Sequence, residues 1–118
     1  MIMRPGRVLR IVTLCWLAGN AALVVAHALF LPLGISDLMD WSVAIVAVPI
    51  VVGLVGVARR RRWGRAVSAL ALAVQVALFS VHLHSMWGHL HGGEWLLLAW
   101  IGYAAIALLA VLVTPADA

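Results

Sequence analysis

The sequence predicts an all-α integral membrane protein built as a bundle of four transmembrane helices. Of its 118 residues, 66% are hydrophobic and only 10% are charged, and the mean hydropathy is +1.14. A soluble domain carries about 25% charged residues, so this chain has too little polar surface to cover a water-soluble globule. Four long apolar runs each approach the length of about 20 residues that crosses a hydrocarbon core about 30 Å thick. We place them in a single membrane domain, 1–118, at 8–31, 39–58, 63–86 and 94–114.

The first predicted helix, 8–31, carries its few polar residues on one face. Thr13, Asn20 and His27 are spaced seven residues apart, and this spacing returns to nearly the same side of an α-helix after two turns. Asn20 lies about 12 residues, or about 18 Å, from the inner boundary of the helix, which is near the middle of the bilayer. An amide at that depth is costly against lipid, so we expect it to face protein.

The second and fourth predicted helices are almost wholly apolar, and each starts beside an acidic residue followed by a tryptophan. Pro49 lies in the middle of the second helix and predicts a kink there. Glycines allow two helix backbones to approach closely. We expect this at Gly53 and Gly56 in the second helix and at Gly102 in the fourth.

The third predicted helix, 63–86, has two distinct faces. Ser68, Gln75 and His82 repeat the seven-residue spacing of the first helix. A second stripe consists of small residues and ends in a histidine: Ala66, Ala69, Ala73, Ala77, Ser80 and His84. Small side chains at this spacing predict a face on which another helix packs closely. We therefore expect both His82 and His84 to be at least partly buried.

The basic residues predict the orientation of the chain. All eight are arginines and fall in two segments, Arg4, Arg7 and Arg10 near the start, and Arg59, Arg60, Arg61, Arg62 and Arg65 between the second and third helices. With four crossings both segments lie on one side of the membrane, and the positive-inside rule assigns that side to the cytoplasm. We expect a bacterial inner (plasma) membrane protein with both termini cytoplasmic. The net charge of +4 then reflects topology and attraction to anionic lipid headgroups of the bilayer, not nucleic-acid binding.

Comparison of the chain with itself predicts an internal repeat. A shift of 55 residues places Arg10 on Arg65, Thr13 on Ser68, Asn20 on Gln75 and His27 on His82. One residue of slippage then places Asp40-Trp41 on Glu94-Trp95. We interpret this as two tandem helical hairpins, a 2+2 parallel repeat related by an axis along the membrane normal. In that arrangement Asn20 and Gln75 lie at equal depth, and we expect them to contact each other.

A histidine and carboxylate cluster is predicted on the outer side. The repeat supplies four candidate ligands, His27, His82, Asp40 and Glu94, and the same side holds three more, His84, His89 and His91. Two imidazoles and two carboxylates suit a divalent transition metal, and two facing histidines suit the axial positions of a haem b iron. Two alternatives stay open: interfacial histidines within an aromatic belt, and a proton-linked role.

Three functions are compatible with these features. The first is a membrane-embedded metal- or haem-binding protein, the second a non-catalytic accessory subunit that packs against a larger membrane complex or a second copy, and the third a small oligomeric proton-linked transporter. The chain is similar in length and helix count to the small multidrug resistance transporters, whose first helix carries an acidic residue that 8–31 lacks. Transport is disfavoured because no ionisable residue lies near the midplane. No catalytic motif is present, so nothing in the sequence indicates an enzyme.

Overall fold

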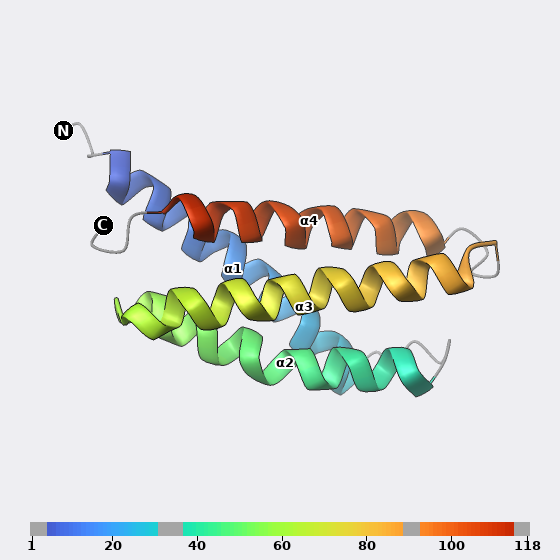
Figure 1. Cartoon of the computed structure of the whole chain (residues 1–118). Helices are drawn as coiled ribbons and strands as arrows, with labels where there is room; N and C mark the ends of the chain where they lie inside the picture. Colours follow the sequence, from blue (N-terminus) through green and yellow to red (C-terminus); the bar gives the residue numbers. More distant parts are fainter. Residues whose placement is uncertain (1–4, 31–36, 89–92, 115–118) are drawn as a thin grey trace.

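The computed structural model describes residues 5–30, 37–88 and 93–114, and these ranges contain helices and short turns but no strand. Four helices follow one another: α1 (Pro5–Phe30), α2 (Asp37–Ala58), α3 (Arg62–Met86) and α4 (Gly93–Val113) (Figure 1). The prediction of an all-α chain is therefore confirmed.

Three of these helices are long and apolar enough to cross a membrane by length and composition: Gly6–Leu29, Arg62–Ser85 and Glu94–Val113. In α2 the apolar stretch is shorter and covers Ser42–Ala58. A membrane location is thus supported by three spans where the sequence predicts four.

The helices form an elongated bundle measuring 50 × 23 × 21 Å. Each of α1 and α3 contacts both α2 and α4, so α1 lies diagonally opposite α3, and α2 opposite α4. Figure 1 shows that the start of α1, the end of α2, the start of α3 and the end of α4 share one end of the bundle. We call this the basic end, because it holds Arg7, Arg10, Arg59, Arg60, Arg61, Arg62 and Arg65. The opposite end, which holds His27, His82, His84 and Glu94, is the histidine end.

A tight turn joins α2 to α3 at the basic end. The backbone N–H of Arg61 donates to the carbonyl of Gly56 at 2.9 Å, and that of Arg60 to the carbonyl of Val57 at 3.1 Å. These two bonds define a Schellman ending, in which one residue takes the left-handed conformation that favours glycine. Here that residue is Arg60, with φ of 57°.

Beside this turn α2 packs closely on α3 at three glycines, Gly53, Gly56 and Gly64. A Cβ atom added to Gly64 would stand 2.2 Å from the carbonyl carbon of Gly56, and one added to Gly53 would stand 2.4 Å from Ser68 Oγ. The expectation of close approach at Gly53 and Gly56 is therefore confirmed. The same expectation is wrong for Gly102, since no atom lies within 4 Å of its Cβ position. This glycine is on the exposed side of α4.

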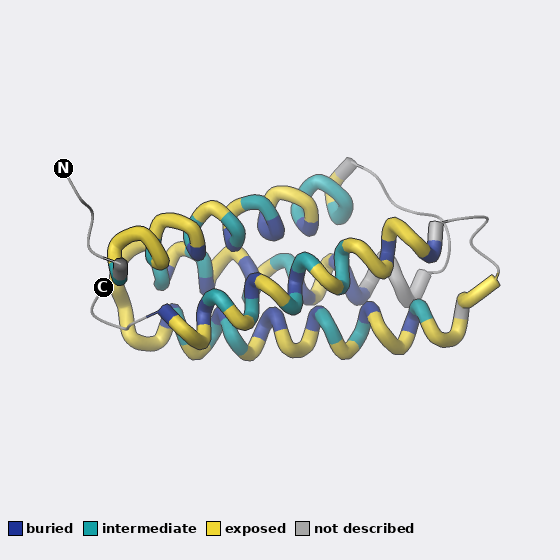
Figure 2. Tube along the Cα trace, turned by 90° about the horizontal axis from the view of Figure 1, so that it is seen from above, coloured by how far each residue is buried: buried dark blue, intermediate teal, exposed yellow. Residues whose placement is uncertain are grey.

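The interior consists of two apolar clusters, one in the middle of the bundle and one toward the histidine end. The first is built around Leu72, Ala104, Ala107 and Val111, and the second contains Val24, Val43, Phe79 and Leu97. Figure 2 shows buried positions recurring along the inward side of each helix while the outward side is exposed. In a membrane-spanning chain the exposed apolar side chains are those that lipid covers.

The small-residue stripe of α3 lies on the outward side of the bundle. Ala66, Ala73, Ala77, Ser80 and His84 are exposed, and only Ala69 is half-buried. The stripe therefore does not lie in the interior of the bundle, and its close packing against another helix stays a prediction. The reason is geometric: α2 and α4 pack on the opposite side of α3, which carries the buried residues Leu72, Gln75 and Phe79.

Candidate functional site

Two buried amides meet in the centre of the bundle. Asn20 Nδ2 donates to Gln75 Oε1 at 2.8 Å, and Gln75 Nε2 donates back to Asn20 Oδ1 at 3.0 Å. The indole Nε1 of Trp100 donates to the same Asn20 oxygen at 3.1 Å. Both amides have no exposed surface. Because α1 and α3 are diagonal partners, this pair joins two helices whose backbones do not touch.

His82 continues the inward side of α3 and is buried, with 6% of its surface exposed. Its Nε2 lies 3.2 Å from Ser42 Oγ on α2. A ring nitrogen in such a bond is already engaged and would need to release the serine before it could ligate a metal ion. The hydroxyl thus satisfies a polar atom that burial would otherwise make costly.

His27 and Glu94 take part in other contacts at the same end. The His27 ring meets Trp100 edge-on with 5.6 Å between ring centroids, and Trp100 in turn meets Phe79 at 4.9 Å. Glu94 is buried in the first turn of α4 and accepts the backbone N–H of Gly88 at 3.0 Å. A carboxylate in the first turn of a helix is also stabilised by the helix dipole.

His84 points outward, so the expectation that it is partly buried is wrong. It lies two residues after His82 on α3, and this spacing places the two rings on different sides of the helix. The His84 side chain contributes to a groove of about 280 Å³ between α3 and α4, which is also lined by Ser80, Leu83, Trp87, Leu98 and Ile101.

The described residues do not supply a metal ligand set. Nowhere among them do three histidine, cysteine or carboxylate side chains come together in a way that could hold a metal ion. His89, His91 and the side chain of Asp40 lie outside the described residues. The metal or haem site at the histidine end stays a prediction of the sequence.

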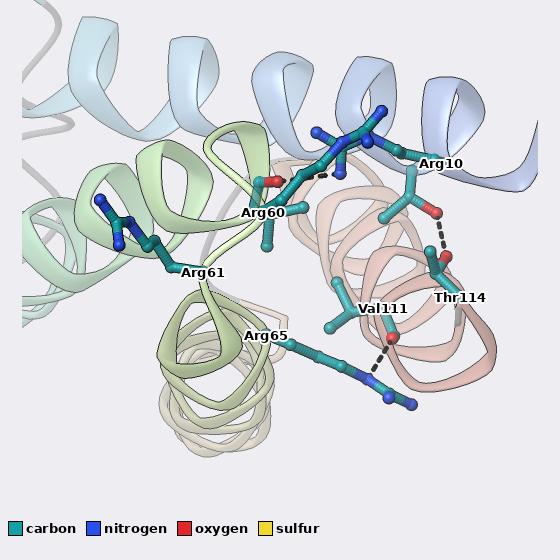
Figure 3. Close-up of a pocket in the computed structure, with 8 residues that line it drawn as sticks. Arg10, Arg60, Arg61, Arg65, Val111 and Thr114 are labelled. Atoms are coloured by element: carbon teal, nitrogen blue, oxygen red, sulfur yellow. Dashed lines mark hydrogen bonds between the residues drawn. The ribbon is translucent and has the colours of Figure 1, made fainter. Parts of the chain in front are cut away.

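The basic end contains a second polar site, a pocket that the sequence pattern does not predict. A cavity of about 30 Å³ is lined by residues from all four helices and the α2–α3 turn: Arg10, Thr13, Val57, Arg60, Arg61, Arg65, Val111 and Thr114. Figure 3 shows the guanidinium groups of Arg10 and Arg60 close together, with Arg61 turned away from them.

Two of these arginines are fixed by the carbonyl ends of other helices. Arg10 donates to the carbonyls of Val57 and Ala58 at 3.0 and 2.9 Å, at the end of α2. In the same way Arg65 donates to the carbonyl of Val111 at 3.1 Å and to that of Leu112, at the end of α4. A cation is favoured at the C-terminal end of a helix dipole, where backbone carbonyls have no partner in the helix.

Several partners could not be found by the spacing argument. One is Trp100, which bonds to the amide pair, and another is Ser42, which bonds to His82. The third is Thr114, whose hydroxyl oxygen lies 2.7 Å from that of Thr13. None of the three lies at a position matched by the 55-residue shift. The only available signal was that each is a rare polar-bearing residue within an apolar helix.

Trp16 and Tyr103 form a further clamp between α1 and α4. Their rings stack with 4.5 Å between centroids. Each side chain also donates to the other residue's backbone carbonyl, Trp16 Nε1 at 2.8 Å and the Tyr103 hydroxyl at 2.9 Å.

Comparison of the chain with protein-family models, with curated proteins and with solved structures gives no match in any of the three.

Proposed function

We propose that this chain is a non-catalytic accessory subunit that packs against a larger membrane complex through the outward side of α3. The observation that carries this proposal is the exposure of the small residues Ala66, Ala73, Ala77 and Ser80 on one helix. Helices associate in membranes mainly by close backbone approach and van der Waals packing, for which small side chains are required.

The exposed surface of α4 differs from this one. On α4, large apolar side chains stand outward, among them Leu96, Ile106, Leu109 and Leu112. Such residues fill space against lipid chains and keep another helix at a distance. The small strip of α3 leads at its far end into the groove beside His84 and Trp87, so a partner helix would find a continuous shallow track.

The interior favours a structural role over transport. Its central polar groups, Asn20 and Gln75, are hydrogen-bonded to each other. Neither of these two amides is ionisable. Transport sites for ions and protons depend on ionisable groups near the midplane. A pair of this kind stabilises the bundle.

The orientation and origin of the two hairpins are part of the same proposal. Arginines at the basic end favour a cytoplasmic location of that end in a bacterial inner membrane. Duplication of one hairpin is supported by the equivalent roles of Arg10 and Arg65. Each arginine lies on the first helix of its hairpin and donates to the last carbonyls of the second helix of the same hairpin. Reporter fusions at each end of the chain test the orientation, and a signal from the outer compartment would contradict it.

The test of the docking surface is a matched pair of substitutions, Ala77→Trp on α3 and Ala99→Trp on α4. Both alanines are exposed, so neither change disturbs the interior. In native membranes extracted with mild detergent, the wild-type chain is expected to migrate in a complex far larger than its own 12.6 kDa. The α3 variant should migrate as the free subunit and the α4 variant in the complex.

Two results would contradict this proposal. One is migration of the wild-type chain as a monomer, and the other is equal retention of both variants in the complex. Co-expression of two differently tagged copies identifies the remaining alternative. If the complex contains only this chain, the outward side of α3 serves self-association and the accessory role is excluded.

A further inference from the structure

We propose that the pocket at the basic end binds one phosphate group, with Arg10 and Arg60 as its main cationic contacts and Arg65 at its edge. This inference is independent of the proposed docking surface, which lies on a different side of the molecule. Its basis is the arrangement of like charges in one small pocket, together with the way in which two of those charges are held.

The guanidinium groups of Arg10 and Arg60 lie close enough to repel one another. They come from α1 and from the α2–α3 turn, so the fold itself brings them together. Among the acidic residues, Glu94 has a described side chain, and it lies in the first turn of α4 at the histidine end, far from the pocket. Two adjacent cations with no described carboxylate between them favour an anion in that position.

Arg10 and Arg65 are already oriented before any ligand arrives. Each guanidinium donates two hydrogen bonds to helix carbonyls. A guanidinium has five N–H donors in a fixed plane. Three donors on each remain for a ligand, and the carbonyls nearest the pocket are occupied, so they repel an incoming anion less. A guanidinium fixed in this way loses little freedom on binding, which favours the planar, two-point recognition of phosphate oxygens.

Arg60 supplies an independent indication that its side chain has a role. It occupies the position of the Schellman ending where the backbone is left-handed, with φ of 57°. Glycine is the usual residue there because an L side chain is strained in this conformation. Arg60 therefore destabilises the free protein in two ways, through backbone strain and through repulsion between its charge and that of Arg10. A bound anion offsets the repulsion.

The size of the cavity limits the ligand. Its volume of about 30 Å³ corresponds to about two waters, since a single water needs at least about 10–15 Å³ by this measure. One phosphate group at the mouth fits this space, whereas a nucleotide base or a peptide does not. Thr13 and Thr114, bonded to each other, close the inner side. The phosphate can come from an anionic phospholipid headgroup, because the basic end lies where α1, α3 and α4 emerge from the membrane, or from inorganic phosphate.

The decisive variant is Arg60→Gly, because it removes the charge and also relieves the backbone strain. The fold of this variant should be at least as stable as wild type, so a loss of binding cannot be attributed to unfolding. Arg59→Gln is the matched control: it removes one charge from the same turn, but Arg59 does not line the pocket. Binding is measured on the purified full chain in neutral detergent as the rise in melting temperature during titration. Three titrants are compared: inorganic phosphate, a short-chain phosphatidic acid, and a phosphatidylcholine of the same chain length.

Stabilisation by phosphatidic acid but not by inorganic phosphate supports the site and identifies a lipid headgroup as the source. Stabilisation by both supports the site and admits free phosphate. In either case Arg60→Gly should weaken the apparent affinity at least about fivefold, while Arg59→Gln changes it less than about twofold. Equal responses to phosphatidic acid and phosphatidylcholine, or an unchanged affinity in Arg60→Gly, would overturn the proposal.

Discussion

Asn20 and Gln75 exchange two hydrogen bonds, of 2.8 and 3.0 Å, across the diagonal of the bundle. Their helices, α1 and α3, make no direct backbone contact. The two amides therefore link α1 directly to α3, and this link opposes sliding of one helix past the other along the bundle axis.

A double-mutant cycle with Asn20→Leu and Gln75→Leu should show strong coupling. Each single change leaves a buried amide without its partner and should cost about 1–3 kcal/mol of unfolding free energy. The double variant should lose less than the sum of the two, by about 0.6–2 kcal/mol. Reversible unfolding in detergent micelles measures all four proteins. Additive losses would show that the pair contributes no more than its separate surroundings.

Gly64→Ala should destabilise the protein, because the new Cβ would stand 2.2 Å from the carbonyl carbon of Gly56, which is backbone and has little freedom to move. Separation of α2 from α3 should cost about 1–3 kcal/mol. Gly102→Ala is the control, since nothing lies within 4 Å of its Cβ position. That variant should be unchanged or more stable by up to about 1 kcal/mol, owing to the higher helix propensity of alanine. The same loss in both variants would point to a general intolerance of change and not to the contact with Gly56.

Ser68→Ala should leave stability unchanged or raise it. The Ser68 hydroxyl is buried and has no hydrogen-bond partner among the described residues, so its removal relieves a desolvation cost of about 1–3 kcal/mol. Thr13→Val tests the position that the 55-residue shift aligns with it. There the hydroxyl bonds to Thr114, and its loss should cost about 0.5–1.5 kcal/mol. Thermal unfolding in one detergent compares the pair. The prediction is wrong if Ser68→Ala is the more harmful change.

The predicted metal or haem at the histidine end is checked by an absorption spectrum with elemental analysis on protein purified without chelator. A haem held by His27 and His82 should give a Soret band, and a metal ion a stoichiometric signal. Either should disappear in the double variant His27→Ala/His82→Ala. A colourless, metal-free wild-type protein would contradict the prediction and leave His82 as a core residue bonded to Ser42.

Composition and residue spacing predict the helical fold class and much of the internal register of the bundle. Hydropathy predicts the four helices, since an apolar run that crosses a membrane must satisfy its backbone polar groups in helical hydrogen bonds. Seven-residue spacing places Thr13 and Asn20 on one side of α1, and Ser68, Gln75 and His82 on one side of α3, and all five side chains are buried. That much is local geometry, which periodicity encodes.

Which side of each helix the bundle covers depends on tertiary packing. The stripe from Ala66 to His84 has the same character as an interior face, yet α2 and α4 pack on the other side of α3, so the stripe is exposed. Pairing across helices depends on the rotation of each helix about its axis. An almost uniformly apolar sequence, such as that of α2 or α4, gives little indication of that rotation. For the same reason the meeting of Arg10 with Arg60, and of Arg10 with the carbonyl end of α2, is seen only when the turn and the helix ends are placed in space.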